Sequence, residues 1–357
     1  MRIKTAYRSL IAAFLLIAVA ANGVGIAAAQ GTPSAEGVEV NKVAIVTPGS
    51  RSNQGWDQQG VDSLEKVGQE RGIEVEVAEN AGYDDITPIL RDLAAGDPQL
   101  IICHASGYQT VCPEFAAESG IPVAVIENQA AIAPGLVADI ETQAQEVAYL
   151  AGFLAGQTTT SGTVGVVVSG EPPTWNYMTV GFAEGLKAAK PDAKLLYSVI
   201  GEAAYDDAAG AKRVTEQQIA NGADVVFGMG DGASFGMLQA IEEHNADNPD
   251  SKVWFIDVIG DKTAEHGDAL LTSVLFDYSG IYGQMIDDLQ AGTFGKVYTM
   301  DVANGGVRLL DLPESVPQAV RDAVAQAQKD IVDGKITVSA ISDSGEMKAR
   351  IDELFPS

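Results

Sequence analysis

The sequence predicts an α/β fold made of two similar, doubly wound lobes, and three observations support it. Short apolar runs without alternation, such as 43–46 and 164–168, indicate strands of parallel sheets that are covered on both faces. Helical patterns alternate with these runs, as expected when helices connect parallel strands. The 357-residue chain is also longer than one hydrophobic core usually serves, which favours two domains.

An internal duplication supports the two lobes independently. The strand at 43–46 recurs at 164–168, and each copy is followed by a polar loop that carries a tryptophan. The sequence Tyr-Asp-Asp at 83–85 recurs at 205–207, and the strand at 123–126 recurs at 253–256. The offsets are 121, 122 and 130 residues. Three landmarks in the same order at nearly constant spacing indicate a repeated structural unit.

The expected helices follow the spacing of small and apolar residues. Examples are 58–70, 86–95, 182–189, 208–220 and 234–243. Several are followed by a glycine that could end the helix, namely Gly72, Gly96 and Gly222.

The first 29 residues are typical of a secretory signal peptide. Arg2, Lys4 and Arg8 precede an apolar run at 10–21, and three alanines at 27–29 offer a cleavage site. An uncleaved membrane anchor is the alternative. Residues 30–40 form a short leader, and no cysteine follows the apolar run for lipid attachment. We therefore expect an exported protein, periplasmic or extracellular.

The charge balance is strongly acidic. Asp and Glu number 49 against 22 Lys and Arg, so the formal net charge is −27. Such a surface disfavours binding to nucleic acid polymers and to anionic membranes, but it does not identify a ligand.

The only two cysteines are Cys103 and Cys112. Export permits a disulfide between them, and their spacing allows one. Two buried thiols are the alternative, because cysteine is a common core residue.

The predicted strands also locate the binding site. Ligands of doubly wound sheets sit outside the carboxyl ends of the strands, and two facing lobes would share one cleft there. The loops expected at this cleft are 48–56, 104–108 and 127–129 in the first lobe, and 169–177, 228–233 and 257–261 in the second. The run 270–275, followed by Phe276, resembles a return crossing near the same cleft.

Trp56 and Trp175 are the most informative candidates in these loops. Two rings on opposite lobes could sandwich a flat ligand, although both could instead be core or surface tryptophans. Asp257 ends an apolar strand, where a carboxylate could accept hydrogen bonds from two hydroxyls or cap a helix. Other polar side chains that could orient a ligand are Asn53, Gln54, Ser106, Tyr108, Asn128 and Asn176.

Enzyme motifs are weak. Gly228-x-Gly230-x-x-Ala233 loosely matches a dinucleotide-binding turn, but the acidic residue expected about 20 positions later is not evident. A tight turn or a glycine-rich edge touching a ligand is the alternative. His104 lies at a strand end as either a ligand contact or a packed imidazole. The three histidines are not spaced as a metal site, and we expect no catalytic residue, metal or cofactor.

Several segments are similar to those of one known family. They are VAIVTPGSRSNQGWDQQG at 43–60, AYLAGFLAG at 148–156, VGFAEGLKAA at 180–189, YDDAAGAK at 205–212, NGADVVFGMGDG at 221–232, LLTSVLFD at 270–277 and DGKITV at 333–338. Through them the chain resembles, over about 41–340, the basic-membrane-protein or PnrA-like family of ABC-transporter substrate-binding proteins. The best-known members of that family bind purine nucleosides.

The resemblance implies a type I periplasmic-binding-protein fold whose lobes are joined by three crossings. The N-terminal lobe would comprise 41–157 and about 278–300, and the C-terminal lobe 158–272 and about 301–345. It implies closure on a small-molecule ligand and delivery to an ABC permease, without a reaction. By the same resemblance, Asn53 and Trp56 would grip a base, Asp257 would bind ribose, and Gly230 and Gly232 would form the loop that approaches the ligand.

Two departures from the family pattern bear on the ligand. The family's first loop carries an Asp shortly before Asn53, where this chain has Gly-Ser-Arg-Ser at 49–52. Phe276 replaces a Lys that contacts the sugar, which suits a free base or another small ring better than a nucleoside. A sensor ectodomain that signals to a membrane receptor, and an exported α/β enzyme, are the competing functions.

Overall fold

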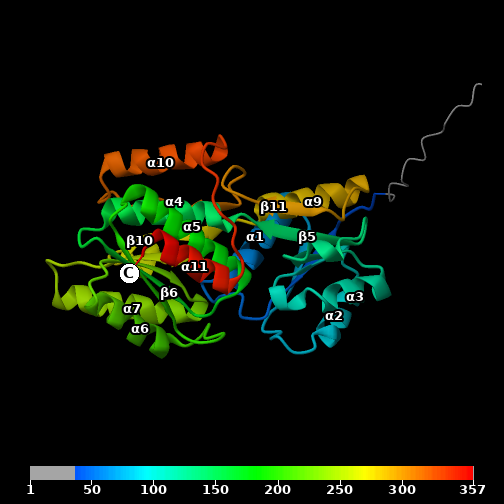
Figure 1. The fold of residues 1–357 in the computed structure, drawn as a ribbon. Coiled ribbons are helices and arrows are strands. Elements are labelled where there is room, and N and C mark those ends of the chain that lie inside the picture. The colour runs from blue at the N-terminus through cyan, green and yellow to red at the C-terminus, as the bar shows by residue number, and fades with distance from the viewer. Residues whose placement is uncertain (1–36, 357) are drawn as a thin grey trace, which may run out of the picture. The chain divides into compact units, whose positions relative to one another are not determined.

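The computed structural model describes residues 37–356, so the expected signal peptide and most of the leader lie outside the described residues. The described chain contains two six-stranded sheets with helices between their strands (Figure 1). The first sheet consists of β1 (Lys42–Val46), β2 (Glu74–Ala78), β3 (Leu100–Cys103), β4 (Val123–Ile126), β5 (Val137–Thr142) and β11 (Val297–Met300). The second consists of β6 (Thr163–Val168), β7 (Lys194–Val199), β8 (Val225–Met229), β9 (Trp254–Val258), β10 (Leu270–Phe276) and β12 (Val307–Leu309). The predicted fold class is confirmed.

The duplication seen in the sequence is present in the sheet topology. The strand orders are β11-β5-β4-β3-β1-β2 and β12-β10-β9-β8-β6-β7, which are the same order when the repeated strands are matched. All neighbouring strands are parallel except β10 and β12, which are antiparallel. Both sheets therefore reverse their winding at equivalent places, between β1 and β3 and between β6 and β8.

Burial explains why these runs form central strands. In β1 and β3 every apolar side chain from residue 43 onward is fully buried, because helices cover both faces of the sheet. The helices of the first half are α1 (Trp56–Arg71), α2 (Thr87–Ala94), α3 (Val111–Ser119) and α9 (Ser279–Ala291). Helix α1 ends where Gly72 adopts a left-handed conformation with φ 70°, as the sequence predicts.

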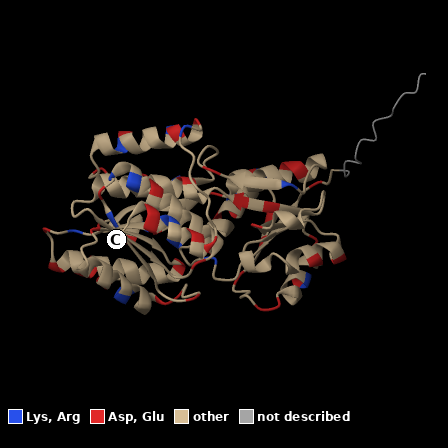
Figure 2. Ribbon diagram, in the orientation of Figure 1, with Lys and Arg blue, Asp and Glu red and all other residues tan. Residues whose placement is uncertain are grey.

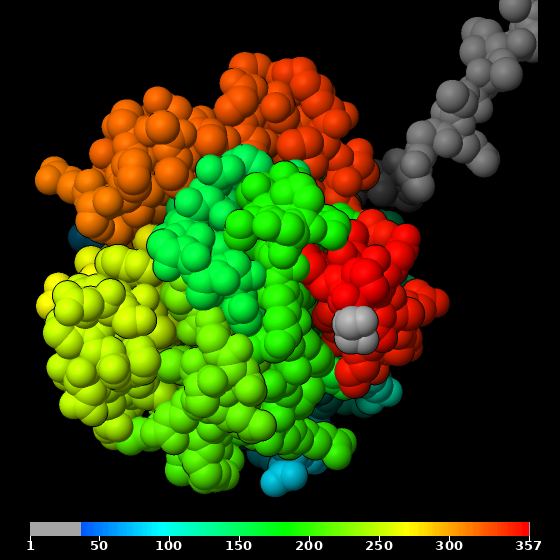
Figure 3. Space-filling model, turned by 60° about the vertical axis from the view of Figure 1, so that its left-hand side comes forward, coloured from blue at the N-terminus to red at the C-terminus, as the bar shows by residue number. Residues whose placement is uncertain are grey.

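The second half carries more helices. They are α4 (Ala144–Thr158), α5 (Pro173–Ala189), α6 (Ala208–Ala220), α7 (Ser234–Asp247), α8 (Thr263–His266), α10 (Gln318–Val332) and α11 (Ser344–Leu354). Helices α10 and α11, which were not among the helices predicted by example from the sequence, pack on α4 and α5 (Figure 3). They cover the outer face of the second half.

Helix α4 lies with the second sheet, although the expected boundary at residue 157 placed it in the first lobe. It packs against α5, α10 and β12. Its side chains are buried around most of the helix circumference, so it needs partners on several sides, and the second half supplies them. The chain thus passes to the second half at about residue 143, directly after β5.

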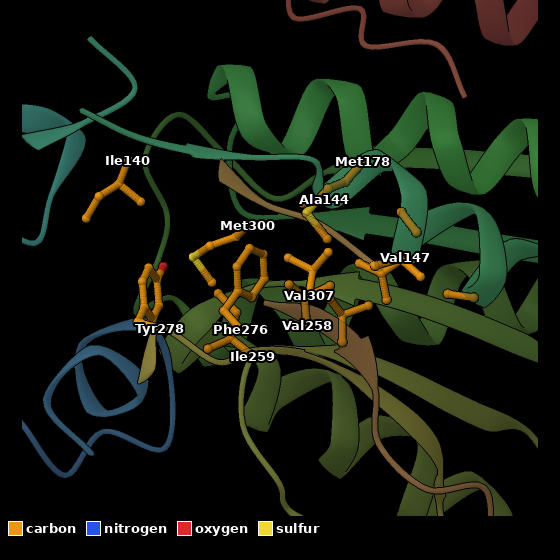
Figure 4. Close-up of a cluster of buried hydrophobic side chains, with 14 of the residues drawn as sticks. Ile140, Ala144, Val147, Met178, Val258, Ile259, Phe276, Tyr278, Met300 and Val307 are labelled. Atoms are coloured by element: carbon orange, nitrogen blue, oxygen red, sulfur yellow. The ribbon is translucent and has the colours of Figure 1, made fainter. Parts of the chain in front are cut away.

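The three connections between the halves run through a continuous apolar core. Ile140 precedes the first connection, Phe276 and Tyr278 flank the second, and Met300 precedes the third, and all four are at most 2% exposed. Figure 4 shows these side chains packed with residues of α4, α5 and the second sheet. We call this cluster the hinge seam.

Two features outside the hinge seam bear on the earlier expectations. Cys103 and Cys112 form a disulfide, which closes the short loop between β3 and α3. Asp and Glu residues occur in both halves (Figure 2). Within residues 37–356, none of the helices combines the length and hydropathy that a bilayer crossing requires.

Candidate functional site

A cavity of about 100 Å³ lies where the carboxyl ends of the two sheets meet. The first half contributes Trp56, Tyr83, Ala105, Ser106, Ile126 and Glu127. The second half contributes Pro172, Thr174, Trp175, Tyr205, Asp231 and Ile259. The loops after β1, β3, β6 and β8 are all represented, and these flank the places where the winding of each sheet reverses. Ligands of doubly wound folds bind at such places.

Larger cavities exist elsewhere, but their positions do not favour them as the ligand site. One of about 730 Å³ lies between α5, β7 and α11 and is lined by residues of the second half only. It is far from the carboxyl ends of the central strands. We therefore take the cavity between the halves, called the cleft below, as the candidate site.

Trp56 forms part of the first wall and is supported from behind. It is the first residue of α1 and stacks on His104, with ring centroids 5.0 Å apart. His104 is fully buried, and this burial lowers its pKa to about 4, so its imidazole is neutral. Its Nε2 lies 3.0 Å from the Trp56 carbonyl oxygen. His104 thus holds the tryptophan and does not line the cleft.

Phe276 also lies behind Trp56. Their rings meet edge to face with centroids 5.4 Å apart, and Phe276 is 2% exposed within the hinge seam. The residue that replaces the family's Lys therefore supports the wall in this structure and is not part of its surface.

Trp175 forms the opposing wall with Tyr205. Trp175 lies in the first turn of α5, where it is 6% exposed, and its ring meets Tyr205 edge to face at 5.4 Å. In the first half, the ring of Tyr83 packs against that of Tyr108. The Tyr108 hydroxyl donates a hydrogen bond to the carbonyl oxygen of Gly82. Both halves therefore present one tryptophan and one tyrosine to the cleft.

Glu127 is the carboxylate that joins the two halves. Its Oε1 accepts hydrogen bonds from Thr174 Oγ1 at 2.5 Å and from Tyr177 Oη at 2.8 Å. Burial raises its pKa. Glu127 has a φ of 55°, a conformation that non-glycine residues rarely adopt. Such strain is often found at functional positions.

Asp231 is the second carboxylate of the cleft. It follows β8 with a φ of 48°, and its Oδ1 is buried without a hydrogen-bond partner among residues 37–356. Burial, reinforced by the negative charge of Asp57, raises the pKa of Asp231 to about 7.

Gly230 and Gly232 flank Asp231 and permit its tight turn. A side chain at Gly230 would collide with the backbone nitrogen of Ser234, and one at Gly232 with the carboxylate of Asp206. In this structure the two glycines shape the loop, while the residue between them faces the cleft.

The loop before α1 is organised by its own polar groups. The Asn53 side chain donates to Asp57 Oδ2 at 2.7 Å and accepts from the Gly55 backbone nitrogen at 2.9 Å. The backbone carbonyl of Gln54 accepts from Lys262 Nζ across the cleft at 3.1 Å. Asn53 and Gln54 thus position Trp56. The loop has no Asp before Asn53, but the buried Asp57, which follows it, places a carboxylate beside the Asn53 side chain.

Asp257 is fully buried and already paired. Its Oδ2 lies 2.5 Å from Lys262 Nζ, and its Oδ1 accepts from the backbone nitrogen of Val258. Lys262 also donates to the carbonyl oxygen of Ile259. The cleft is lined two residues after Asp257, by the apolar Ile259.

The two remaining candidate asparagines have structural partners. Asn128 donates its side-chain amide to the carbonyl oxygen of Gln109. Asn176 is 3% exposed and donates to the carbonyl oxygens of Glu171 and Ser342. Neither lines the cleft.

Of the twelve candidate residues, the structure brings three to the cleft surface, namely Trp56, Ser106 and Trp175. The sequence analysis did not select Tyr83, Tyr205, Glu127 and Asp231 as binding residues. The first two are the tyrosines of the repeated Tyr-Asp-Asp landmark, and the other two fall inside loops that the strand positions predicted. The repeated Tyr-Asp-Asp sequence was therefore the feature from which the two tyrosines could have been predicted.

No metal site stands out: among residues 37–356, no group of three or more His, Cys, Asp or Glu side chains is arranged to hold an ion.

Comparisons with known proteins agree with this architecture. A family model described as "ABC transporter substrate-binding protein PnrA-like" matches residues 40–342. A protein from Lactococcus lactis subsp. cremoris named "ABC transporter nucleoside-binding protein BmpA" is 30% identical over 227 residues, which is 60% of this chain and 62% of that protein. The match thus spans less than two thirds of that relative's length.

Solved structures show the same fold. A solute-binding protein of an ABC transporter system from Aeropyrum pernix K1 superposes with a TM-score of 0.74 at 18% identity, covering 88% of this chain and 97% of that one. Another from Conexibacter woesei superposes with a TM-score of 0.71 at 21% identity, covering 85% and 99%. Both are named as solute-binding proteins of ABC transporter systems, and their likeness to this chain confirms the predicted fold.

Proposed function

This chain belongs to the family of PnrA-like ABC transporter substrate-binding proteins, and on that premise we propose that it captures a small molecule containing a planar ring for an importer. One observation carries the proposal: Trp56 and Trp175, which come from different halves of the molecule, line the same cavity. A ring held between them would contact both halves at once. Binding would then stabilise the closed arrangement that a permease recognises.

The size of the cleft favours a small ring. Its volume of about 100 Å³ is below the roughly 300–1,000 Å³ usual for ligand pockets. A nucleobase or a similar ring therefore suits this closed form better than a larger solute, while a nucleoside requires the halves to separate further. The Lactococcus relative's printed name, a nucleoside-binding protein, supports the same class of ligand.

Contacts across the cleft support closure on the ligand. Thr174 and Tyr177 of the second half bind Glu127 of the first, and Lys262 of the second half binds the Gln54 carbonyl of the first. These contacts can form only when the halves approach. A ligand that fills the cleft adds further contacts to both sides and so favours the same state.

The proposed setting is outside the cytoplasm, with an ABC permease as the partner at the membrane. Family membership supports both statements, and the basic and apolar pattern at residues 1–29 is consistent with export. Cell fractionation of the full-length chain in its native host is the direct measurement. Recovery in the cytoplasm would contradict this setting. It would argue against both a binding protein of an importer and a sensor ectodomain.

The binding proposal is tested by thermal-shift and calorimetric titration with purine nucleosides, nucleobases and sugars. Tight binding raises the unfolding free energy by RT ln(1 + [L]/Kd), about 2.7 kcal/mol when the ligand is at 100 times Kd. We expect ring compounds, and not sugars, to stabilise the protein. Native mass spectrometry of freshly purified protein would identify a ligand that co-purifies.

A matched pair of variants tests the tryptophan wall. Trp175→Leu should weaken binding of a responding ring compound by about 10-fold or more, because base–aromatic stacking contributes about 1–3 kcal/mol per base. Trp254→Leu is the control, since Trp254 lies on β9 away from the cleft. Equal loss of affinity in both variants would contradict the proposed wall.

A further inference from the structure

The walls of the cleft carry negative charge without a matching positive charge. Glu127 and Asp231 line the cavity, and Asp57 is close enough for its charge to raise the pKa of Asp231. Among the described lining residues there is no Lys or Arg. The neighbouring Lys262 is already paired with the buried Asp257. The cleft therefore holds an excess of carboxylates.

Of the two carboxylates that line the cleft, Asp231 is the one with a buried oxygen that has no hydrogen-bond donor among residues 37–356. Glu127 accepts from two hydroxyls, and Asp57 accepts from the Gly49 backbone nitrogen and from Asn53. Asp231 Oδ1 is buried and has no such partner within residues 37–356. A buried carboxylate without a donor is costly, so a donor that arrives with the ligand would relieve the cost.

The aromatic residues of the cleft add a second, independent preference. Four rings line it: Trp56, Tyr83, Trp175 and Tyr205. The face of an aromatic ring carries partial negative charge and attracts cations, most strongly where water is excluded. Aromatic rings combined with carboxylates are the usual environment of organic cations in binding proteins.

We propose that the ligand of this cleft is an organic cation: a planar ring that is protonated or N-alkylated, or that carries an ammonium group, with its positive charge against Asp231. The inference rests on the proposed binding function and specifies the class of ring compound. A neutral ring could donate one hydrogen bond to Asp231, but it would leave the carboxylate charge of the cleft uncompensated. A protonated ring or an ammonium group supplies both the hydrogen bond and the positive charge, and an N-alkylated ring supplies the charge.

The negative net charge of the chain also favours a cationic ligand. The formal net charge is −27, so the field around the protein attracts cations and repels anions such as nucleotides. Burial, reinforced by the negative charge of Asp57, raises the pKa of Asp231 to about 7, although the charge of Lys262 acts in the opposite direction. A bound cation is expected to lower that pKa.

The test uses three pairs of compounds that share a ring and differ in charge. They are 1-methyladenosine with adenosine, 1-methylnicotinamide with nicotinamide, and tryptamine with tryptophol. Affinities are measured by calorimetry at pH 7.5 and low ionic strength, with the full mature chain. We expect the cation to bind at least about 10-fold more tightly than its neutral twin in at least one pair.

Matched variants assign the preference to Asp231. Asp231→Asn keeps the size of the side chain and removes its charge, so it should reduce the ratio of cation to neutral affinity to below about 3-fold. Asp247→Asn is the control, because Asp247 is exposed at the end of α7 and should leave the ratio unchanged. A loss in Asp231→Asn that is equal for both members of a pair would overturn the role of its charge.

The outcomes separate this inference from the broader proposal. If the neutral compound binds as tightly as its cationic twin in every pair that binds, the charge preference is overturned while the binding function stands. If no cation binds more tightly than its neutral twin in any pair, including the case of no measurable binding, the inference is overturned. Binding of sugars alone would overturn both proposals.

Discussion

The hinge seam and the cleft both lie between the two sheets, yet the side chains that form them differ in chemical character. The seam joins the halves through buried apolar side chains such as Ile140, Tyr278 and Met300 (Figure 4). The cleft is lined by aromatic rings and by two carboxylates, one of which has an unpartnered oxygen. Ile259 belongs to both, so the two regions meet there.

This difference shows that the residues that stabilise the fold are distinct from the residues that would bind a ligand. Burial of apolar surface holds the seam together whether or not a ligand is present. In the cleft, by contrast, a buried oxygen of Asp231 has no hydrogen-bond donor among residues 37–356. A ligand that donates a hydrogen bond to it would gain free energy from that contact.

The largest expected effect comes from unpairing a buried charge beside the cleft. Lys262→Met leaves Asp257 buried without its cation and should lower the unfolding free energy by about 3–5 kcal/mol. Urea unfolding at pH 7.5 measures the loss. In the double variant Lys262→Met/Asp257→Leu no charge is left unpaired, so most of the stability should return. A double variant as unstable as the single one would contradict this interpretation.

A cavity in the hinge seam should have the next largest effect. Met300→Ala removes a fully buried side chain and should cost about 2–5 kcal/mol in urea unfolding. Val297→Ala is the control on the same strand, β11, where Val297 is 36% exposed and the change should be within about 1 kcal/mol. Comparable losses in the two variants would mean that the seam is not a tightly packed core.

Removing the unpartnered carboxylate should instead stabilise the protein, and more so at higher pH. The folded-state pKa of Asp231 is raised to about 7 from 3.8, so its stabilising contribution is present below pH 4 and is lost as pH rises through 7. The advantage of Asp231→Asn over the wild type should therefore be smaller at pH 5 than at pH 8, where it should reach about 1–3 kcal/mol.

The comparison with the variant isolates Asp231 from its charged neighbours, which are Asp57, Lys262, Asp257 and Asp206 in order of influence. The same charged neighbours are present in both proteins, so the difference between the two proteins reports on Asp231. Unfolding curves at the two pH values provide the measurement. The same stability difference at pH 5 and pH 8 would show that Asp231 is not the group that titrates.

The smallest effect is expected at the contact that closes the cleft. Tyr177→Phe removes the hydroxyl that donates to Glu127 and that also bonds with Thr142, and should cost about 0.5–1.5 kcal/mol of stability. Because Glu127 retains the bond from Thr174, ligand affinity should fall by less than about 10-fold. A total loss of binding would place the tyrosine in direct contact with the ligand.

The fold could be predicted because its cause is local and repeated. Fully buried strands require continuous apolar runs, and the second copy of each run follows the first at nearly the same spacing. Helix α6 begins and ends where the sequence predicts, at residues 208 and 220. The position of α4 was not predictable in the same way. Its all-round apolar surface shows that it is buried but not against which half.

The site could be predicted only down to its loops. Strand ends located the right segments, since position along a parallel strand fixes which edge of the sheet a loop occupies. Within a loop, a polar residue may face the cleft or bond to its own backbone, and the composition is the same in both cases. Asn53 and Asn128 bond internally, while the neighbouring Trp56 and Glu127 line the cavity.

The sequence by itself determined the two α/β lobes, the matching order of their strands, and the six loops at the mouth of the cleft. These follow from hydrophobic periodicity and repetition, which are properties of consecutive residues. Only the tertiary structure decided that Asp257 is paired with Lys262, that Phe276 supports Trp56, and that Asp231 Oδ1 has no hydrogen-bond partner among residues 37–356. Whether two side chains meet depends on how a loop folds, even when they are five residues apart as in Asp257 and Lys262, and on which distant segments pack together, as in Phe276 and Trp56. A linear pattern contains neither.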